Sequence, residues 1–208
     1  MKSQIPPLYN KYFVQKQDER RELFRLLRDL FRIEKGLYPG SFTHVAPSFY
    51  IPEMVYVDMD KRCPQFFSDE TTRRFINESK DYSVASEIRF YYSDFSMEIP
   101  EKEGRFDLLI SLYSGFISRY CKQYLRKDGI LLANNSHGDS SLAHLDEDFK
   151  FIGVIKRNGE RFRFNDDNLD SYFITKTGKP IDKNAIEKNM RGPEFTKTAY
   201  AYVFRKRN

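Results

Sequence analysis

The sequence predicts an α/β fold with a doubly wound, mostly parallel sheet and helices on both of its faces. Two observations support this prediction. Short apolar runs that suit buried strands alternate with segments long enough to form helices. In addition, the turn glycine Gly40 is followed 18 residues later by Asp58 at the end of such a run, which is the skeleton of a βαβ unit. With 208 residues, the chain is expected to form a single domain, residues 1–208.

Residues 1–35 are expected to form a lead-in and a helix that precede the sheet. The first part, residues 1–15, contains two adjacent prolines and is predicted to be irregular. Residues 16–34 show the periodicity of an amphipathic helix, and Gly36 is placed to cap its C-terminus. The apolar side chains on one face of this helix are Leu23, Leu26, Leu27, Leu30 and Ile33.

After this helix, predicted strands and helices alternate. The expected strands are residues 37–38, 54–57, 87–92, 106–112, 130–133, 151–155 and 199–204. The expected helices are residues 66–80, 116–125 and 140–149, the second ending at the turn LRKDG. Residues 165–198 are polar and too long for a tight hairpin, so we expect an insertion with structure of its own that serves as a lid or recognition element.

The composition suits a chain with a folded core. Hydrophobic residues make up 40% of the chain, and no apolar run approaches the roughly 20 residues that span a bilayer. The N-terminus lacks the apolar segment of a secretory signal, so a cytoplasmic location is expected. Cys63 and Cys121 lie far apart, without metal-ligand spacing, and are expected to be reduced thiols.

The net charge of +5 is unevenly distributed along the chain. Residues 151–208 contain 13 Lys and Arg against 7 Asp and Glu, whereas the first 150 residues contain 22 against 23. A basic segment of this kind is typical of a surface that faces nucleic acid or another anion. A solvated surface is the alternative, and the modest size of the excess favours it.

The order of the predicted elements, together with two segments, resembles the class I S-adenosylmethionine-dependent methyltransferases. FDLLISLYSG is similar to the fourth-strand motif of that family, and YLRKDGILLANN is similar to its helix, turn and fifth strand. The resemblance covers roughly residues 16–207. It implies a seven-stranded sheet with an antiparallel last strand, S-adenosylmethionine as methyl donor and S-adenosylhomocysteine as product. The acceptor, a small molecule or a macromolecule, is not implied, nor is the oligomeric state.

The resemblance also implies cofactor-binding residues at the carboxyl ends of the first four strands, where open α/β sheets bind their ligands. Asp58 is placed to accept hydrogen bonds from the ribose hydroxyls, and Met59 to pack against the adenine. His44, on the first crossover, is expected to line the same pocket, with a structural histidine as the alternative. The other implied positions are Tyr38, Gly40 and Ser41 beside the methionine moiety, Asp94 and Phe95 at the adenine edge, and Ser111 and Leu112 at the end of the fourth strand.

The glycine motif after the first strand departs from the family pattern. Phe42 and His44 stand where glycines are expected, and their side chains are large enough to occupy the space of the amino acid moiety. A catalytically inactive chain that serves as a binding or interaction module is therefore one alternative to an enzyme. A Rossmann-like protein for another nucleotide is a second, since a carboxylate on a ribose does not specify the rest of the ligand.

Residues 134–139, NNSHGD, are the stretch with the most potential for chemistry. They follow the fifth predicted strand, at the edge of the sheet that carries the cofactor turn. His137 and Asp139 are predicted to act as acid and base partners that deprotonate the acceptor. The alternative is a helix entry in which Ser and Asp side chains cap free N–H groups. The spacing of histidines and aspartates fits no metal-ligand set, so no metal is predicted.

Overall fold

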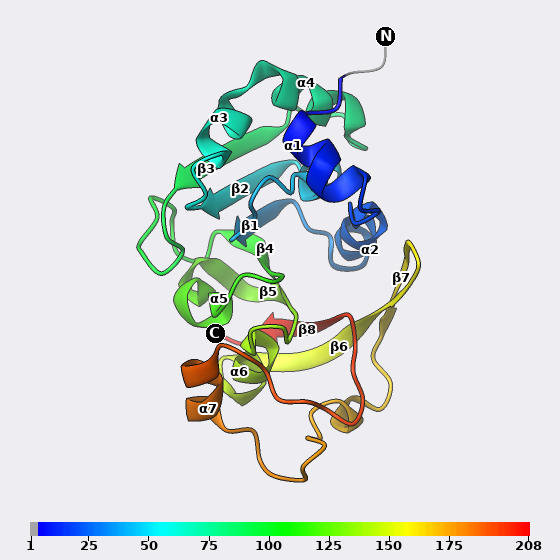
Figure 1. Cartoon of the computed structure of the whole chain (residues 1–208), viewed down its shortest axis with the longest axis vertical. Coiled ribbons are helices and arrows are strands. Elements are labelled where there is room, and N and C mark those ends of the chain that lie inside the picture. The colour runs from blue at the N-terminus through cyan, green and yellow to red at the C-terminus, as the bar shows by residue number, and fades with distance from the viewer. Residues whose placement is uncertain (1–3) are drawn as a thin grey trace.

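The computed structural model describes residues 4–208, so the first three residues of the expected lead-in lie outside the described residues. Within the described part, eight strands form one sheet in the order β3-β2-β1-β4-β5-β8-β6-β7 (Figure 1). Strands β1 to β5 are parallel, and β8 is antiparallel to both neighbours, β5 and β6. The strands are β1 (Lys35–Pro39), β2 (Glu53–Asp58), β3 (Glu87–Tyr92), β4 (Phe106–Ser111), β5 (Leu125–Ala133), β6 (Phe149–Asn158), β7 (Arg161–Asn165) and β8 (Ala201–Lys206).

Helices cover both faces of the sheet, which confirms the predicted doubly wound α/β fold. One buried cluster joins helices α1 to α4 to one face, and a second joins α5 and α6 to the other. The neighbours Leu37 and Tyr38 of β1 belong to different clusters, as the alternation of side chains along a strand requires. The helices are α1 (Pro7–Tyr9), η1 (Asn10–Val14), α2 (Arg21–Phe31), η2 (Ala46–Phe49), α3 (Cys63–Ser68), α4 (Glu70–Ser79), α5 (Ile117–Tyr120), η3 (Lys122–Tyr124), α6 (Asp139–Leu145), η4 (Leu169–Ser171) and α7 (Lys183–Asn189).

The N-terminal segment differs from the prediction. Residues 7–14 are helical rather than irregular, and Pro7 occupies the first helical position, where no N–H is needed. Helix α2 is shorter than predicted and is followed by Arg32, which adopts a left-handed φ of 54°. Gly36 is not its cap. It lies in β1, where a Cβ would meet the side chain of Met54.

Three other elements differ locally from their predicted bounds. The helix expected at 66–80 is divided into α3 and α4 by Asp69, whose side chain caps α4 by accepting a 2.7 Å hydrogen bond from the N–H of Thr71. The helix expected at 116–125 is the short α5 followed by η3. The LRKDG turn lies inside β5, with Asp128 at a φ of 60°.

An unpredicted strand, β7, forms an antiparallel hairpin with β6 at the edge of the sheet, so the described part has eight strands where seven were expected. Residues 165–198 contain η4, α7 and an isolated bridge between Thr175 and Phe195. Ile186 of α7 packs against Leu142 of α6, which fixes this segment to the body of the protein. None of the helices within residues 4–208 is both long enough and apolar enough to cross a membrane.

Candidate functional site

The carboxyl ends of the parallel strands meet at one edge of the sheet, and the strand order reverses between β1 and β4. Open α/β sheets bind ligands at such a switch point. Gly40 turns the chain after β1 with a φ of +66°, and its N–H donates a 2.8 Å hydrogen bond to the carbonyl of Val57. A methyl group on Gly40 would overlap the Cβ of Ser114 in the loop after β4. The β1 turn and the β4 loop are therefore in direct contact at the switch point.

Asp58 ends β2 and holds the β1 turn in place. Its Oδ2 accepts a 2.7 Å hydrogen bond from the N–H of Phe42, and its Oδ1 accepts a 2.8 Å bond from the N–H of Asp60. A carboxylate has about four acceptor positions, so both oxygens keep capacity for further donors. Asp60, by contrast, pairs with the guanidinium of Arg62 at 2.7 Å. Of the two aspartates after β2, Asp58 is therefore the one that contacts the switch-point turn.

Phe42 adopts a left-handed backbone conformation, with a φ of 47°. Glycine adopts this conformation without the steric cost that a side chain adds. The turn thus keeps a glycine-like shape at a position where the family resemblance expects glycine. The Phe42 ring packs edge-on against Tyr12 at 5.0 Å and lies 4.5 Å from the Arg62 guanidinium. The adjacent Ser41 is buried, and its hydroxyl donates to the Phe42 carbonyl at 3.2 Å.

His44 is fully enclosed between the β1 turn and the N-terminal segment. Its Nε2 lies 2.9 Å from the carbonyl of Glu19, which can only accept, so Nε2 carries the hydrogen. Its Nδ1 then accepts from the hydroxyl of Tyr38 at 3.3 Å. Burial, and secondly the charge of Arg20, lowers the pKa of His44 to about 3. Because both ring nitrogens are used inside the protein, this geometry supports the structural alternative for His44.

The ends of β2 and β3 carry exposed apolar side chains. Met59, Tyr92 and Met97 are 64%, 59% and 63% exposed. Asp94 forms a turn in which its Oδ1 accepts a 2.8 Å hydrogen bond from the N–H of Ser96. The half-buried ring of Phe95 would be in contact with a Cβ placed on Gly115 of the β4 loop. Of the positions predicted beside the adenine, Met59 is therefore exposed, Phe95 borders the β4 loop, and Asp94 is used in a local turn.

Ser111 and Leu112, at the end of β4, are both buried. The Ser111 hydroxyl donates to Asp139 Oδ2 at 2.5 Å, and the Ser118 hydroxyl donates to Oδ1 at 2.6 Å. The Ser118 N–H also donates to Asp139, at 3.0 Å. Burial raises the pKa of Asp139 to about 6, although these hydrogen bonds oppose the rise. The Asp139 carboxylate thus joins β4, α5 and α6 from inside the protein.

His137 does not share a hydrogen bond with Asp139. Its Nδ1 lies 3.3 Å from the carbonyl of Met190, just after α7, and therefore carries the hydrogen. The structure places the two side chains on different partners, so the predicted acid and base pair is not formed between them. Gly138 precedes α6 without a side-chain cap, so the alternative role of capping is not seen at this helix, although Asp139 accepts from the N–H of Ser118 in α5.

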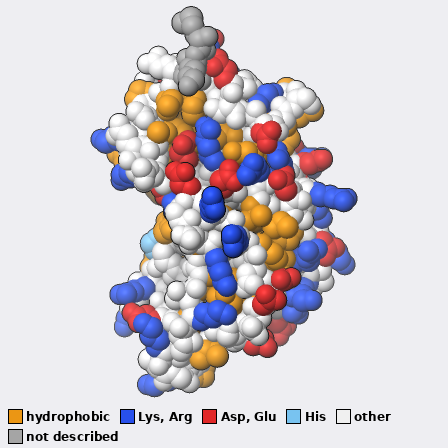
Figure 2. Space-filling model, turned by 90° about the vertical axis from the view of Figure 1, so that its right-hand side faces the viewer, with side chains coloured by type: hydrophobic (Ala, Val, Ile, Leu, Met, Phe, Trp, Pro, Cys, Tyr) orange, Lys and Arg blue, Asp and Glu red, His pale blue; other side chains and the backbone are white. Residues whose placement is uncertain are grey.

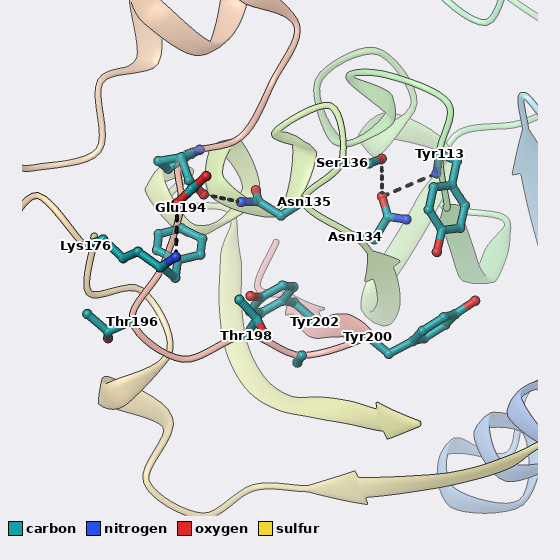
Figure 3. A pocket seen from close by; sticks show the side chains of 13 residues that line it. Tyr113, Asn134, Asn135, Ser136, Lys176, Glu194, Thr196, Thr198, Tyr200 and Tyr202 are labelled. Carbon is teal, nitrogen blue, oxygen red and sulfur yellow. Dashed lines mark hydrogen bonds and ion pairs between the residues drawn. The ribbon is translucent and has the colours of Figure 1, made fainter. Parts of the chain in front are cut away.

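A cavity of about 600 Å³ opens at the same edge of the sheet (Figure 3). Its walls come from the loops after β4 and β5, from the 165–198 segment and from the start of β8. The polar groups are neutral hydroxyls and amides apart from Lys176, which pairs with Glu194 at 3.1 Å. Asn134 is oriented by hydrogen bonds to its Oδ1 from the Ser136 hydroxyl at 2.9 Å and the Tyr113 N–H at 3.3 Å. Other lining residues include Thr198, Tyr200 and Tyr202.

The sequence indicated two walls of this cavity, the loop at 134–139 and the 165–198 segment that was expected to serve as a lid or recognition element. It did not single out Lys176, Glu194 or Tyr200, which are distant from that loop in the chain. The position of Tyr113 directly after an apolar strand was the one available signal.

A buried guanidinium lies near both the cavity and the β1 turn. The Arg20 side chain is 8% exposed, its Nε donates to Asp18 at 3.1 Å, and it lies 5.2 Å from the centre of the Tyr113 ring. Burial raises the pKa of Tyr38 to about 12 and also raises the pKa of Tyr200, and the charge of Arg20 opposes both rises. The Tyr200 hydroxyl is buried and has no hydrogen-bond partner among residues 4–208. A buried hydroxyl without a partner is a position where a ligand can add a hydrogen bond.

The side chains of the residue types that bind metals do not gather at one point in the described part of the chain. Across residues 4–208, no group of three or more His, Cys, Asp or Glu side chains is placed to hold a metal ion.

No family model matches the sequence, and comparison with curated proteins finds no match either. Solved structures do resemble the fold. A methyltransferase from Geobacter sulfurreducens is 15% identical, with 73% of this chain and 85% of that chain covered and a TM-score of 0.49. The YcgJ protein from Bacillus subtilis is 19% identical, with a TM-score of 0.39 and 58% of this chain covered. This chain spans about half of YcgJ, 54% of its length.

The likeness to an S-adenosylmethionine-dependent methyltransferase from Thermotoga maritima is more extensive. It covers 96% of this chain and 94% of that chain, with 10% identity and a TM-score of 0.52. At this identity the likeness concerns the fold, and it includes nearly every element of both chains. The fold of this chain is therefore that of the class I S-adenosylmethionine-dependent methyltransferases.

Proposed function

We propose that the chain transfers a methyl group from S-adenosylmethionine to an acceptor held in the cavity beside Tyr113. The observation that best supports this is the position of the cavity, at the carboxyl edge of a methyltransferase-like sheet and next to the β1–β4 switch point. A donor at the switch point and an acceptor in the cavity meet at the loop after β4, which borders both. Holding two reactants in line is the main contribution that such an enzyme makes to the rate.

The ends of β2 and β3 fit the adenosine half of the donor. Both oxygens of Asp58 keep acceptor capacity for the ribose hydroxyls. The exposed side chains of Met59, Tyr92 and Met97 supply apolar surface for the adenine. When bound, S-adenosylmethionine supplies an electrophilic methyl group on its sulfonium.

The methionine half of the donor needs space that the contact between Gly40 and Ser114 now fills. The Ser114 hydroxyl is buried without a partner in the described part of the chain, and its neighbours Tyr113 and Gly115 have φ values of 63° and 105°. An unsatisfied hydroxyl next to a left-handed tyrosine makes this loop conformation unfavourable. In the proposed function, the loop moves away from Gly40 when the donor binds, and Ser114 gains a hydrogen-bond partner.

His137 keeps the role of proton acceptor in this proposal. Because Nδ1 carries the hydrogen that faces Met190, Nε2 has a free lone pair, and the adjacent Ser136 lines the cavity. Asp139 is given a positioning role instead, because its carboxylate is enclosed by the donors of Ser111 and Ser118.

The contact between Gly40 and Ser114 also favours a second candidate function. If the β4 loop does not move, the donor cannot lie along the β1 turn. The chain would then be an inactive member of the fold that binds a ligand or partner through the cavity without transferring a methyl group.

Titration calorimetry with S-adenosylmethionine and S-adenosylhomocysteine, with ATP and NAD as controls, tests the proposal. We expect micromolar binding of the first two ligands alone. Asp58→Asn should weaken that binding at least tenfold, since a hydrogen bond to a charged group contributes about 1.5–3 kcal/mol. Asp60→Asn is the matched control, because it makes the same change two residues away, where the carboxylate pairs with Arg62.

A Ser114→Gly variant separates the two candidate functions. If the wild type binds the donor and the variant binds it equally well or more tightly, the result supports a loop that moves. Binding by the variant alone supports the inactive chain, because the blocked turn is then the cause. If neither protein binds the donor while both remain folded by circular dichroism, the donor assignment is wrong.

A further inference from the structure

The hairpin of β6 and β7 presents a cationic face. Residues directly opposed in an antiparallel pair share a face, and here Lys156 is opposed to Arg163, and Asn158 to Arg161. The three basic side chains are exposed, and within residues 4–208 none of them takes part in an ion pair or a side-chain hydrogen bond. Like charges directly opposed across two strands are destabilising. An anionic partner on this face would relieve the repulsion.

The other face of the hairpin is fixed to the body of the protein. Phe164 packs edge-on against Phe31 of α2, with ring centres 5.6 Å apart. Arg157 pairs with Asp18 at 2.7 Å, and its guanidinium lies 5.3 Å from the Phe162 ring. The cationic face therefore lies on a rigid support rather than on a mobile loop.

The cationic side chains lie on the same face of the sheet as Tyr202, a residue that lines the cavity. Val154 of β6 is opposed both to Asn165 of β7 and to Tyr202 of β8, and Tyr202 lines the cavity. Lys156 lies two residues further along β6 on the same face, a distance of about 7 Å. Figure 3 shows the β6 and β7 strands passing beneath Tyr200 and Tyr202. A ligand that extends from the cavity along this surface thus meets Lys156 and Arg163.

Acidic residues lie at the ends of this hairpin rather than in its middle. Glu160 is in the turn between the strands, and Asp166 follows β7. Figure 2 views the molecule from the side on which β7 lies in Figure 1, and shows Lys and Arg side chains in a run down the middle of that side, with Asp and Glu beside it. Within residues 4–208, neither Glu160 nor Asp166 forms an ion pair with Lys156 or Arg163.

We infer that this surface binds single-stranded RNA, with phosphates on Lys156 and Arg163 and one unpaired nucleotide in the cavity. Apart from the ion pair of Lys176 and Glu194, the polar groups that line the cavity are neutral hydroxyls and amides, as suits a base edge and a ribose, and Tyr113 is 51% exposed for stacking. A cavity of about 600 Å³ holds one nucleotide but not a duplex. RNA binding by this surface does not depend on the proposed function. That the bound RNA is the methyl acceptor does rest on the proposed function.

Fluorescence anisotropy with a fluorescein-labelled, mixed-sequence RNA of about 12 nucleotides tests the inference, without donor present. The test variant is Lys156→Gln with Arg163→Gln. The matched control is Lys150→Gln with Arg205→Gln, another opposed basic pair, at the other end of β6. We expect the test variant to bind at least tenfold more weakly and the control to change less than twofold. The slope of log K against log salt should fall by about 1.4 in the test variant alone, about 0.7 for each lost phosphate contact.

Three results would overturn the inference: no RNA binding by the wild type, equal losses in the two double variants, or equally tight binding of DNA of the same sequence. The donor titration fails or succeeds independently. RNA binding without donor binding would support the RNA-binding surface and refute the proposed methyl transfer. Donor binding without RNA binding would support the donor site and refute the RNA-binding surface.

Discussion

Acidification should destabilise the folded chain through His44. The folded state holds the pKa of this imidazole at about 3, mainly by burial, whereas an unfolded histidine has a pKa near 6.5. Between these values the unfolded chain binds a proton that the folded chain does not, so stability is lost as the pH falls below 6.5. At pH 5 the difference from one such group is about 2 kcal/mol, and at pH 7.5 it is close to zero.

Urea unfolding of the wild type and of a His44→Gln variant at these two pH values measures this effect. Glutamine can still donate to the Glu19 carbonyl but does not titrate. The variant should be the less stable protein at pH 7.5, and the difference between the two should shrink by about 2 kcal/mol at pH 5. Other titrating groups are common to both proteins and cancel. If both proteins lose the same stability on acidification, His44 is not buried in its neutral form and the reasoning about the β1 turn fails.

Three further predictions concern two glycine turns, the two cysteines and the buried carboxylate of Asp139. Gly40→Ala should lower the unfolding free energy by about 2 kcal/mol, because it combines a positive φ with overlap against the β4 loop. Gly104→Ala, at a φ of +63° where a Cβ would meet only the Arg126 Cα at 4.0 Å, should lower it by about 1 kcal/mol. Equal losses in the two variants would argue against the overlap. Burial raises the pKa of the Cys63 and Cys121 thiols to about 12, so both should resist alkylation by iodoacetamide until the chain unfolds. Rapid alkylation of the folded chain, detected by mass spectrometry, would contradict their burial. The raised pKa of Asp139, about 6, means that its contribution to stability is lost as the pH rises from about 4 to 6. The difference in unfolding free energy between the wild type and Asp139→Asn, measured with urea, should therefore shift against the wild type over that range, because the His44 effect is common to both proteins and cancels. A difference that does not change with pH would contradict the raised pKa.

The main sheet could be predicted from the sequence because its central strands are short apolar runs, a pattern that is typical of buried strands. FDLLISL and the run before Asp58 are buried strands in the structure, as predicted. The β7 strand was missed although RFRFN alternates with period two, because residues 161–164, between the expected strand at 151–155 and the expected insertion at 165–198, were assigned to no element. The N-terminal helix was missed because Pro7 was interpreted as a breaker, whereas proline suits the first position of a helix.

The candidate site was only partly predictable, for a different reason. Gly40 and Asp58 belong to one local βαβ unit, so their spacing placed them together at the switch point. The cavity joins segments up to about ninety residues apart, and no local pattern in the sequence indicates that Tyr113 and Tyr200 face one space. The state of His44 depends on the Glu19 carbonyl, a tertiary contact that residue type and spacing do not reveal.

The position of β8 has a consequence for the order in which the sheet is assembled. This strand is the last of the eight along the described chain, yet it lies between β5 and β6 and pairs with both. During synthesis, β1 to β5 can pair as they emerge, whereas the hairpin of β6 and β7 has no place in the sheet until residues 201–206 are made. A nascent chain would therefore hold two separate sheet fragments, each with an open edge next to the gap that β8 later closes. Premature termination before β8 should yield an aggregation-prone protein rather than a smaller folded one.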